Sequence, residues 1–406
     1  MILHQLIGGI YNMFKTEQEA ITYIEHQVNK RPLEAYHEVL KKHHIDTSFT
    51  YFIHVTGTNG KGSTVNYLRN LLNQAGYKVG TFTSPYLISY HDRFCIDGKP
   101  ISGKKLLEIV NEAWDIIEGE HLSKFEIDVL ITLLYFKKEK VDYAIIEVGI
   151  GGRLDKTNVV QSKLSLISNV GYDHMSLLGN TLEEIAYQKA GIIKPHTHVI
   201  TTEKRPSCLK VIQEEALKVG ATCELVEVPS LLQQPLTFTW KDKEMIFKDV
   251  ALYQINNMLL ALHAFDYLQI ELPLDVIEST LKTTQWAGRF EKMTKEKQTY
   301  IDGAHNKDGI EALVQTLDSY HKDFVVIFSA LKDKDYPYMI DYLQKRYLVY
   351  VTVFADERQT HLEDLKDYEH VFENFDEAYK AAKELNRPIV ITGSLHFISY
   401  VRKKLI

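Results

Sequence analysis

The chain has 406 residues, 45% of them hydrophobic and 25% charged, and a formal net charge of −7. This length predicts two or three domains, and the negative charge disfavours a general nucleic-acid-binding protein. Three scattered cysteines, Cys95, Cys208 and Cys223, indicate neither a disulfide framework nor a zinc site. No run is long enough for a membrane span, and Met1–Ile10 lacks the basic start of a signal peptide. We therefore expect a cytoplasmic protein.

Apolar, β-branched runs alternate with helical patterns along most of the chain, which predicts an α/β fold with largely parallel sheets. In the first part of the chain, buried strands are expected at Tyr51–Val55, Val79–Thr83, Tyr143–Val148, Leu164–Val170 and His198–Thr202. A hairpin is expected next, followed by a helix, at Thr237–Trp240, Glu244–Val250 and Tyr253–Leu268.

A glycine-rich stretch follows the first strand and reads Thr56-Gly57-Thr58-Asn59-Gly60-Lys61-Gly62-Ser63-Thr64. Between a strand and a helix, glycines let backbone N–H groups turn toward an anion, and the helix N-terminus adds partial positive charge. Lys61 can reach terminal phosphates, and Ser63 or Thr64 can face a magnesium ion. Gly62 separates Lys61 from Ser63, which departs from the common P-loop pattern. The context still predicts a nucleoside triphosphate site.

Two later strand ends carry candidates for metal binding. Glu147 ends a predicted strand, where a carboxylate is either a magnesium ligand or a cap for the next turn, and the P-loop upstream favours the metal. His174 follows the next strand and, taken alone, is more often a structural histidine than a ligand. Lys189, on the helical stretch after it, would by itself be a solvated lysine.

The alternation of strands and helices starts again after the polar stretch Lys282–Lys297, which we interpret as a hinge. Strands are expected at Thr299–Ile301, Phe324–Phe328, Leu348–Phe354 and Ile389–Ile391. We predict two domains, residues 1–284 and 285–406. The first is an N-terminal P-loop ATPase-like domain with a mostly parallel sheet, and the second is a smaller C-terminal Rossmann-like α/β domain.

Further motifs follow the P-loop in order, and together they cover the chain from about residue 50 to its end. They are Phe82-Thr83-Ser84-Pro85-Tyr86-Leu87, Glu147-Val148-Gly149-Ile150-Gly151-Gly152-Arg153-Leu154-Asp155, Tyr172-Asp173-His174 with Leu178-Gly179, Lys189-Ala190-Gly191-Ile192-Ile193-Lys194, Tyr253-Gln254 with Asn257, Trp286-Ala287-Gly288-Arg289-Phe290-Glu291, Asp302-Gly303-Ala304-His305-Asn306, Leu331-Lys332-Asp333-Lys334-Asp335 and Thr392-Gly393-Ser394-Leu395. This ordered set resembles the folylpolyglutamate synthase/dihydrofolate synthase family of the Mur ligase superfamily.

The resemblance implies roles for single positions. It identifies Ser84, Glu147 and His174 as magnesium ligands and Lys189 as a lysine that CO₂ carbamylates, so that it supports a second magnesium. The expected catalytic residues are thus Lys61, Glu147, His174 and Lys189. Besides the P-loop residues Thr58–Thr64, the expected contacts to ATP are Gln254, Asn257, Arg289, Asp302 and His305. The expected contacts to the pterin end of the folate are Phe125, Glu126, Leu154 and Asp155.

The implied activity is ATP-dependent addition of L-glutamate to a folate through an acyl phosphate, with release of ADP and phosphate. The partners would be these small molecules, without nucleic acid or membrane, and the protein would be a monomer. An alternative is a dihydrofolate synthase that acts on dihydropteroate, alone or as a second activity of the same site. Further alternatives are a cell-wall Mur ligase, which Gly62 disfavours, and a degenerate ATP-binding paralogue without folate ligation.

Three departures from the family pattern lie near the expected folate pocket. The segment Lys30–Val39 lacks the glycines that usually precede the P-loop, and Val129 stands where the family often has threonine. Asp92 replaces the usual glutamate, although the following Arg93 is kept. We nevertheless expect a reduced folate to serve as the acceptor.

Overall fold

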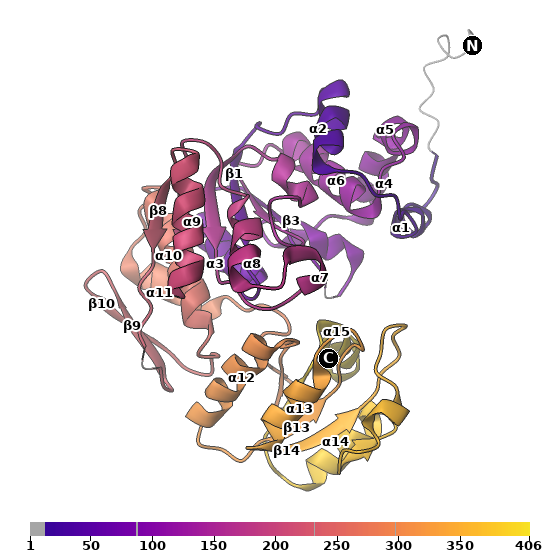
Figure 1. Cartoon of the computed structure of the whole chain (residues 1–406), viewed down its shortest axis with the longest axis vertical. Coiled ribbons are helices and arrows are strands. Elements are labelled where there is room, and N and C mark those ends of the chain that lie inside the picture. Colours follow the sequence, from indigo (N-terminus) through magenta and orange to yellow (C-terminus); the bar gives the residue numbers. More distant parts are fainter. Residues whose placement is uncertain (1–12, 87, 231, 297) are drawn as a thin grey trace.

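The computed structural model describes residues 13–86, 88–230, 232–296 and 298–406, which form two lobes around separate β-sheets (Figure 1). The expectation about Met1–Ile10, the motif position Leu87 and the hinge position Lys297 concern residues outside these ranges. Within the described ranges, every helix is too short or too polar to cross a membrane.

The larger sheet belongs to the N-terminal lobe. Its strands are β1 (Tyr51–Thr56), β2 (Val79–Phe82), β3 (Phe94–Ile96), β4 (Lys99–Pro100), β5 (Tyr143–Glu147), β6 (Ser162–Ile167), β7 (His198–Thr201) and β8 (Thr222–Leu225). They lie in the order β4-β3-β2-β5-β1-β6-β7-β8. All neighbouring pairs from β2 to β8 are parallel, whereas β3 and β4 form an antiparallel edge. The carboxyl ends of the central strands therefore meet at one edge.

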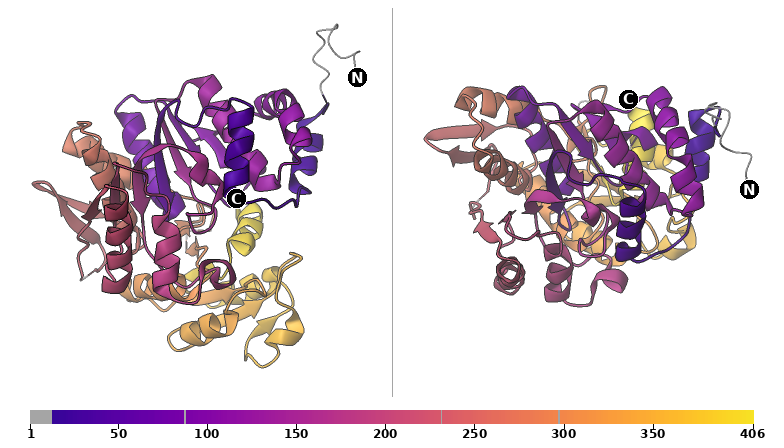
Figure 2. Two further views of the ribbon diagram at one scale, coloured as in Figure 1. Left: turned by 45° about the horizontal axis from the view of Figure 1, so that its top comes forward. Right: turned by 90° about the horizontal axis from the view of Figure 1, so that it is seen from above.

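Helices cover both faces of this sheet (Figure 1, Figure 2). One face and its helices enclose a hydrophobic core, and these helices are α1 (Glu17–Glu25), α2 (Leu33–Lys42), α4 (Gly103–Glu112), α5 (Trp114–Gly119) and α6 (Lys124–Glu139). The opposite face is covered by α3 (Lys61–Gln74), α10 (Gln254–Tyr267) and α11 (Leu274–Thr283). The remaining helical segments of this lobe are η1 (Tyr90–Arg93), η2 (Lys156–Val159), α7 (Met175–Leu178), α8 (Leu182–Ala190) and α9 (Pro206–Lys218).

Helix α3 forms because its apolar residues recur at helical spacing. Val65, Leu68, Leu71 and Leu72 are all buried and pack into the core shared with β1 and α10. The helix ends before Gly76, whose positive φ of 90° stops the helical path. The antiparallel hairpin of β9 (Leu236–Trp240) and β10 (Lys243–Phe247) packs into the same core.

The smaller sheet forms the C-terminal lobe. Its strands are β11 (Glu291–Lys292), β12 (Thr299–Ile301), β13 (Val325–Phe328), β14 (Leu348–Thr352), β15 (Val371–Phe372) and β16 (Ile389–Thr392). Their order is β11-β12-β16-β13-β14-β15, with only the β11–β12 pair antiparallel among the described residues. One face packs against α12 (Lys307–Ser319) and α13 (Tyr336–Gln344), and the other against α14 (Phe375–Glu384) and α15 (Leu395–Leu405). A short helix, η3 (Leu362–Leu365), lies between β14 and β15.

The α/β fold with two mostly parallel sheets is confirmed, and each predicted strand has a counterpart within a few residues. The largest shift concerns Leu164–Val170, because β6 ends at Ile167 and the next residues turn toward the P-loop. Sequence patterns missed β3, β4, β8, β11 and β15, which are short; β4, β8, β11 and β15 are edge strands, and β3 lies beside β4. Short strands carry too few residues for a periodic signal. The domain boundary at residue 284 stays a prediction.

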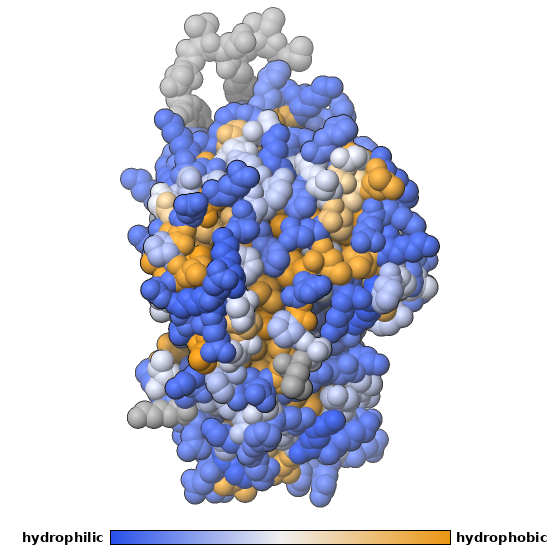
Figure 3. All heavy atoms as spheres, turned by 90° about the vertical axis from the view of Figure 1, so that its left-hand side faces the viewer, coloured by the Kyte–Doolittle hydropathy of each residue, from blue (hydrophilic) through white to orange (hydrophobic). Residues whose placement is uncertain are grey.

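Polar side chains dominate the outer parts of the face shown in Figure 3, while apolar side chains gather nearer its middle.

The buried position of Leu68 allows a test of this core. Leu68→Ala should lower the free energy of unfolding by about 2–5 kcal/mol, because it removes a fully buried side chain between the sheet and α10. Leu217→Ala is the matched control, since Leu217 also lies on a helix but is 78% exposed, and it should change stability by less than about 0.5 kcal/mol. Urea denaturation measures both; equal effects would contradict the packing described.

Candidate active site

A cavity of about 690 Å³ lies between the two lobes. Residues that follow β1, β2, β5 and β6 line it from the larger sheet, and residues that follow β12, β13, β14 and β16 line it from the smaller sheet. Carboxyl ends of parallel strands are the usual ligand-binding edge of α/β sheets. Here two such edges face one cavity, whose size suits a small-molecule site.

Most of the residues predicted from the sequence line this cavity. They are Thr58, Asn59, Gly60, Lys61, Gly62, Ser63, Ser84, Phe125, Glu147, Asp155, His174, Lys189, Asn257, Arg289, Asp302 and His305. Four predicted residues lie outside its lining: Thr64, Glu126, Leu154 and Gln254.

The P-loop is held by the loop that follows β6. The Thr58 amide donates to the carbonyl of Asn169 at 3.0 Å, and the Asn59 amide donates to the Asn169 side-chain oxygen at 2.9 Å. Lys61 folds back so that its Nζ donates to the Gly57 carbonyl at 3.1 Å. The Ser63 hydroxyl is buried and has no hydrogen-bond partner among the described residues. The loop therefore presents a cation and a free hydroxyl to the cavity.

Two glycines of the loop are required by close contacts. Gly60 has a φ of 88°, and a Cβ there would lie 2.1 Å from Oδ1 of Asn257 on α10. A Cβ on Gly62 would lie 3.1 Å from Nε1 of Trp286 in the predicted hinge. Gly62, which breaks the common P-loop pattern, thus stands where the hinge tryptophan approaches the first turn of α3.

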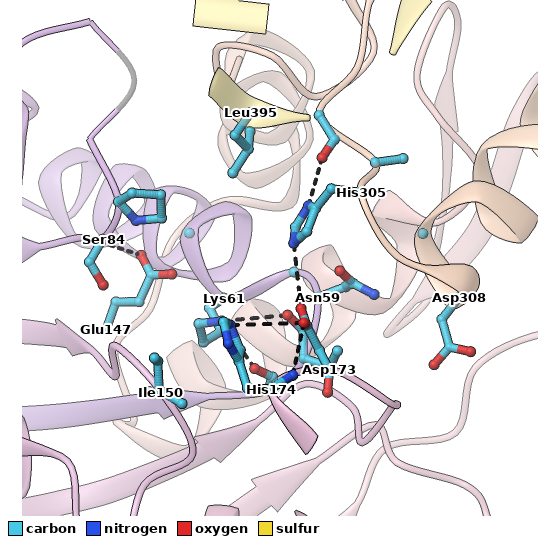
Figure 4. Close-up of a pocket in the computed structure, with 18 of the residues that line it drawn as sticks. Asn59, Lys61, Ser84, Glu147, Ile150, Asp173, His174, His305, Asp308 and Leu395 are labelled. Atoms are coloured by element: carbon cyan, nitrogen blue, oxygen red, sulfur yellow. Dashed lines mark hydrogen bonds and ion pairs between the residues drawn. The ribbon is translucent and has the colours of Figure 1, made fainter. Parts of the chain in front are cut away.

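Ser84 and Glu147 lie side by side on one wall of the cavity (Figure 4). The Ser84 amide donates to Oε2 of Glu147 at 3.3 Å, while the Ser84 hydroxyl is buried without a partner in the described chain. Burial raises the pKa of Glu147 to about 7, although the nearby charge of Lys61 acts in the opposite direction. A buried carboxylate beside an unused hydroxyl supplies the hard oxygen donors that Mg²⁺ prefers. These residues fit a magnesium ion.

His174 faces the same cavity from the loop after β6, where Figure 4 places it beside Asp173 and Lys61. It is a half-exposed residue with a positive φ of 51°, and its Nε2 lies 3.9 Å from Oδ1 of Asp173. Burial lowers its pKa, against the raising effect of Asp173. Within the described residues, no three His, Cys, Asp or Glu side chains form a ready metal cluster. The predicted ligands thus share a cavity without being gathered together.

Lys189 is buried at the end of α8, with only 2% of its surface exposed, and lines the cavity. Burial lowers the pKa of its amine far below the ordinary lysine value, and the like charge of Lys61 adds to this effect. Within the described ranges, the amine has neither a hydrogen-bond partner nor an ion-pair partner. The sequence reading of Lys189 alone, as a solvated lysine, is therefore wrong. A neutral amine in this position is chemically nucleophilic.

Asp173 links the two lobes, a role that the sequence did not reveal. Its carboxylate lies 2.7 Å from Nζ of Lys334 and 3.5 Å from Nε2 of His305, and Asn306 donates to it at 3.4 Å. Burial alone would raise its pKa, but His305 and Lys334 hold the pKa of Asp173 well below the usual range. Both Asp173 and Lys334 belong to motifs named in the sequence analysis, but nothing in the sequence indicated that the two residues pair.

Among the predicted nucleotide contacts, some side chains line the cavity and others hold lining residues in place. Asn257 lines the cavity, whereas the Gln254 oxygen accepts a hydrogen bond from the Asn257 amide at 2.8 Å and lies behind it. Asp302 lines the cavity but accepts hydrogen bonds from the Tyr253 hydroxyl and from the Phe290 amide at 2.8 Å. Burial raises the pKa of Asp302, against these hydrogen bonds and the charge of Arg289. Gln254 thus supports Asn257 within α10, and Asp302 joins Tyr253, at the start of α10, to the C-terminal lobe.

At the predicted folate end, neighbouring residues point in different directions. Phe125 lines the cavity, but Glu126 is buried next to it and pairs with Arg31 at 3.2 Å and with Lys156 at 3.1 Å. Successive side chains on a helix point about 100° apart, which separates the two. Leu154 is 62% exposed outside the cavity lining, while the Asp155 carboxylate lines the cavity and accepts from the Ile150 amide.

Comparisons with known proteins agree with this geometry. Residues 55–264 match the Mur ligase middle domain, and residues 288–395 match the Mur ligase glutamate ligase domain. The chain is 37% identical over 385 residues to a dihydrofolate synthase/folylpolyglutamate synthase of Bacillus subtilis (strain 168), covering 87% of this chain and 90% of that protein.

Solved structures are similar over nearly the whole chain. A bifunctional folylpolyglutamate synthase/dihydrofolate synthase with Mn, AMPPNP and L-glutamate bound superposes with a TM-score of 0.83 at 26% identity, covering 96% of this chain and 98% of that chain. A folylpolyglutamate synthase complex with AMPPCP and folate gives a TM-score of 0.82 at 29% identity, covering 96% and 100%.

The contact between Gly60 and Asn257 can be tested with a matched glycine. Gly60→Ala should weaken binding of an ATP analogue by about tenfold or more, because its Cβ collides with Asn257 and displaces the loop. Gly76→Ala shares the left-handed backbone, with a φ of 90°, but its Cβ meets open space, so nucleotide affinity should stay unchanged. Isothermal calorimetry measures both. Similar affinities for the two variants would show that the close approach is not needed for nucleotide binding.

Proposed function

The chain belongs to the Mur ligase family, among the folylpolyglutamate and dihydrofolate synthases, and we propose that it joins L-glutamate to a reduced folate and converts ATP to ADP and phosphate in the process. The observation that carries this function is the meeting of two strand edges at one cavity. The P-loop lies at the first edge, and the residues after β12 and β16 lie at the second. A nucleotide and an amino acid can therefore be held on opposite walls.

The reaction has two steps. The acceptor carboxylate attacks the γ-phosphorus of ATP, which breaks the bond to ADP and gives an acyl phosphate. The α-amine of glutamate then attacks the acyl carbon, and the tetrahedral intermediate expels phosphate and leaves an amide. The first step brings two anions together, so Lys61 and Arg289, both in the cavity lining, would neutralise charge during phosphoryl transfer.

We propose Ser84, Glu147 and His174 as the ligands of a magnesium ion. When bound, the ion supplies positive charge to the phosphates of ATP. The free Ser84 hydroxyl and the buried Glu147 carboxylate support this assignment. His174 would complete the set from the loop after β6, whose Asn169 also holds the P-loop.

We further propose that Lys189 carries a carbamate. The neutral amine favoured by its burial can attack the carbon of CO₂, with loss of one N–H proton to solvent, and so becomes an anion. An anion there suits a site that would otherwise hold two lysines, Lys61 and Lys189, near one another. It would support a second magnesium ion.

A dihydrofolate synthase activity is the second candidate. The Bacillus subtilis relative carries both activities in its name, and one similar structure is described as bifunctional. Dihydropteroate lacks the first glutamate but has a reacting carboxylate of its own, so the same two steps apply to it. A monomeric state, a cytoplasmic location and the two domains at residues 1–284 and 285–406 stay predictions.

The function is tested by measuring which folate or pteroate acceptors receive glutamate. With ATP, Mg²⁺ and labelled glutamate, the wild-type protein should add one glutamate to tetrahydrofolate, and mass spectrometry of the product measures this. Lys61→Ala should lower the rate by about 10²-fold or more, because it removes a charge from the phosphoryl-transfer site. Its thermal unfolding should stay close to that of the wild type, since Lys61 is the first residue of α3 and lines the cavity rather than a core. Absence of any product from folate or pteroate acceptors would refute the function.

The carbamate is tested at Lys189. Lys189→Ala should keep its affinity for an ATP analogue but lose ligation, and a short carboxylate added in excess should restore part of the activity. Native mass spectrometry of the wild type in CO₂-saturated buffer should show one added carbamate that Lys189→Ala lacks. Lys194→Ala is the control, because Lys194 is a partly buried lysine whose pKa is also lowered by burial, to about 8, and it is not expected to carry the carbamate. Full ligation by Lys189→Ala would rule the carbamate out.

A further inference from the structure

Arg93 occupies the cavity wall beside Ser84, and none of the proposed roles uses it. It is the last residue of η1, and its carbonyl accepts a hydrogen bond from the Thr83 amide at 3.1 Å. The next residues pair in the sheet, where Phe94 lies opposite Phe82. Arg93 is therefore fixed by backbone contacts next to the end of β2, and it lines the cavity together with Phe125.

The guanidinium of Arg93 is buried without hydrogen-bond partners. Only 7% of the residue is exposed, and both Nε and Nη1 lack an acceptor among the described residues. The nearest carboxylate belongs to Asp128, whose Oδ2 lies 3.7 Å from Nε, beyond hydrogen-bond distance. Asp128 accepts instead from the Tyr90 hydroxyl at 2.5 Å. A buried cation with unused N–H groups is costly, and its ion pair with Asp128 leaves these groups without hydrogen bonds, so this position favours a ligand that accepts them.

The surroundings define the chemistry of the missing group. The rings of Tyr86 and Tyr90 lie 5.2 and 6.0 Å from the guanidinium carbon and shield it from water. A planar guanidinium with free N–H groups matches a carboxylate, to which it donates two parallel hydrogen bonds. Arg93 lines the same cavity as Ser84 and Glu147, the proposed magnesium ligands, and under the proposed function the acceptor carboxylate would meet the γ-phosphate near them.

We propose that Arg93 binds a carboxylate of the folate acceptor and so positions the acceptor for phosphoryl transfer. This inference rests on the proposed function. Two carboxylates share the required chemistry: the one that reacts, and the unreacting α-carboxylate of a terminal glutamate. Dihydropteroate has only the first, whereas tetrahydrofolate has both, so the two compounds distinguish the sources.

The experiment compares the affinities of these two acceptors in the presence of a non-hydrolysable ATP analogue. Because removal of Arg93 alone would leave Asp128 as an unpaired buried anion, Arg93→Met is made in an Asp128→Asn background. Asp128→Asn alone serves as the reference, and Arg93→Lys tests whether charge without the planar fork suffices. Arg69→Met is the matched control, since Arg69 lies on α3, bonds to Asn66 and does not line the cavity.

Arg93→Met should weaken acceptor binding by about 10- to 100-fold, the range for a lost charge-assisted pair of hydrogen bonds, and Arg93→Lys should restore only part of it. Affinity for the ATP analogue should change by less than about twofold, because Lys61 and the P-loop bind the phosphates. If affinity for both acceptors falls equally, Arg93 binds the reacting carboxylate. If only the affinity for tetrahydrofolate falls, Arg93 binds the α-carboxylate.

Unchanged affinity for both acceptors, or a loss confined to the nucleotide, would overturn the proposal. A loss of thermal stability that leaves both affinities intact would make Arg93 a structural residue and also overturn it. The product assay of the wild type with tetrahydrofolate tests the proposed function separately. If the wild type ligates glutamate but acceptor affinity does not depend on Arg93, only the role of Arg93 is refuted.

Discussion

The site depends on the close approach of distant segments to the backbone of the P-loop. Asn257 of α10 lies where a Cβ on Gly60 would be, and Trp286 of the hinge packs against Gly62. A Cβ on Gly60 would collide with Asn257, and a Cβ on Gly62 would have to displace Trp286 slightly, so the phosphate loop, α10 and the link to the second lobe pack directly against one another. A change in any of them is expected to reach the bound nucleotide through direct contact rather than through the core.

The charges around the cavity explain why this arrangement suits a ligase. Among the described residues, Lys61 and Arg93 are cations without a carboxylate at hydrogen-bond distance, burial favours the neutral amine of Lys189, and burial raises the pKa of the Glu147 carboxyl to about 7. Such groups are costly to bury in an empty protein, and the cost is offset when anionic substrates and cations bind. Asp173 is the exception, because Lys334 already pairs with it from the other lobe. The Asp173–Lys334 ion pair joins the two walls of the cavity, whereas the groups without partners are those that substrates and cations can bind.

The sequence predicted which residues line the cavity where this follows from a place at the end of a strand, and the roles of these residues stay predictions. The P-loop, Ser84, Glu147 and His174 each follow or end a parallel strand, and the geometry of such a sheet brings these positions to one edge. Thr64, Glu126, Leu154 and Gln254 were also expected at the site but lie outside the cavity lining, although each neighbours a lining residue in the chain. Side-chain direction depends on the turn of a helix or loop and on the partner available, such as Arg31 for Glu126.

The α/β architecture, the phosphate loop and the family could be predicted from the sequence alone, because these depend on hydrophobic periodicity and on short motifs whose chemistry is local. Which charged groups lie close together depends on the three-dimensional fold. Asp173 and Lys334 lie in different lobes, and Arg93 and Asp128 lie on different elements of the same lobe. Burial and pairing arise from contacts between segments far apart in the chain, and these contacts set whether a lysine is charged and whether an arginine has a partner.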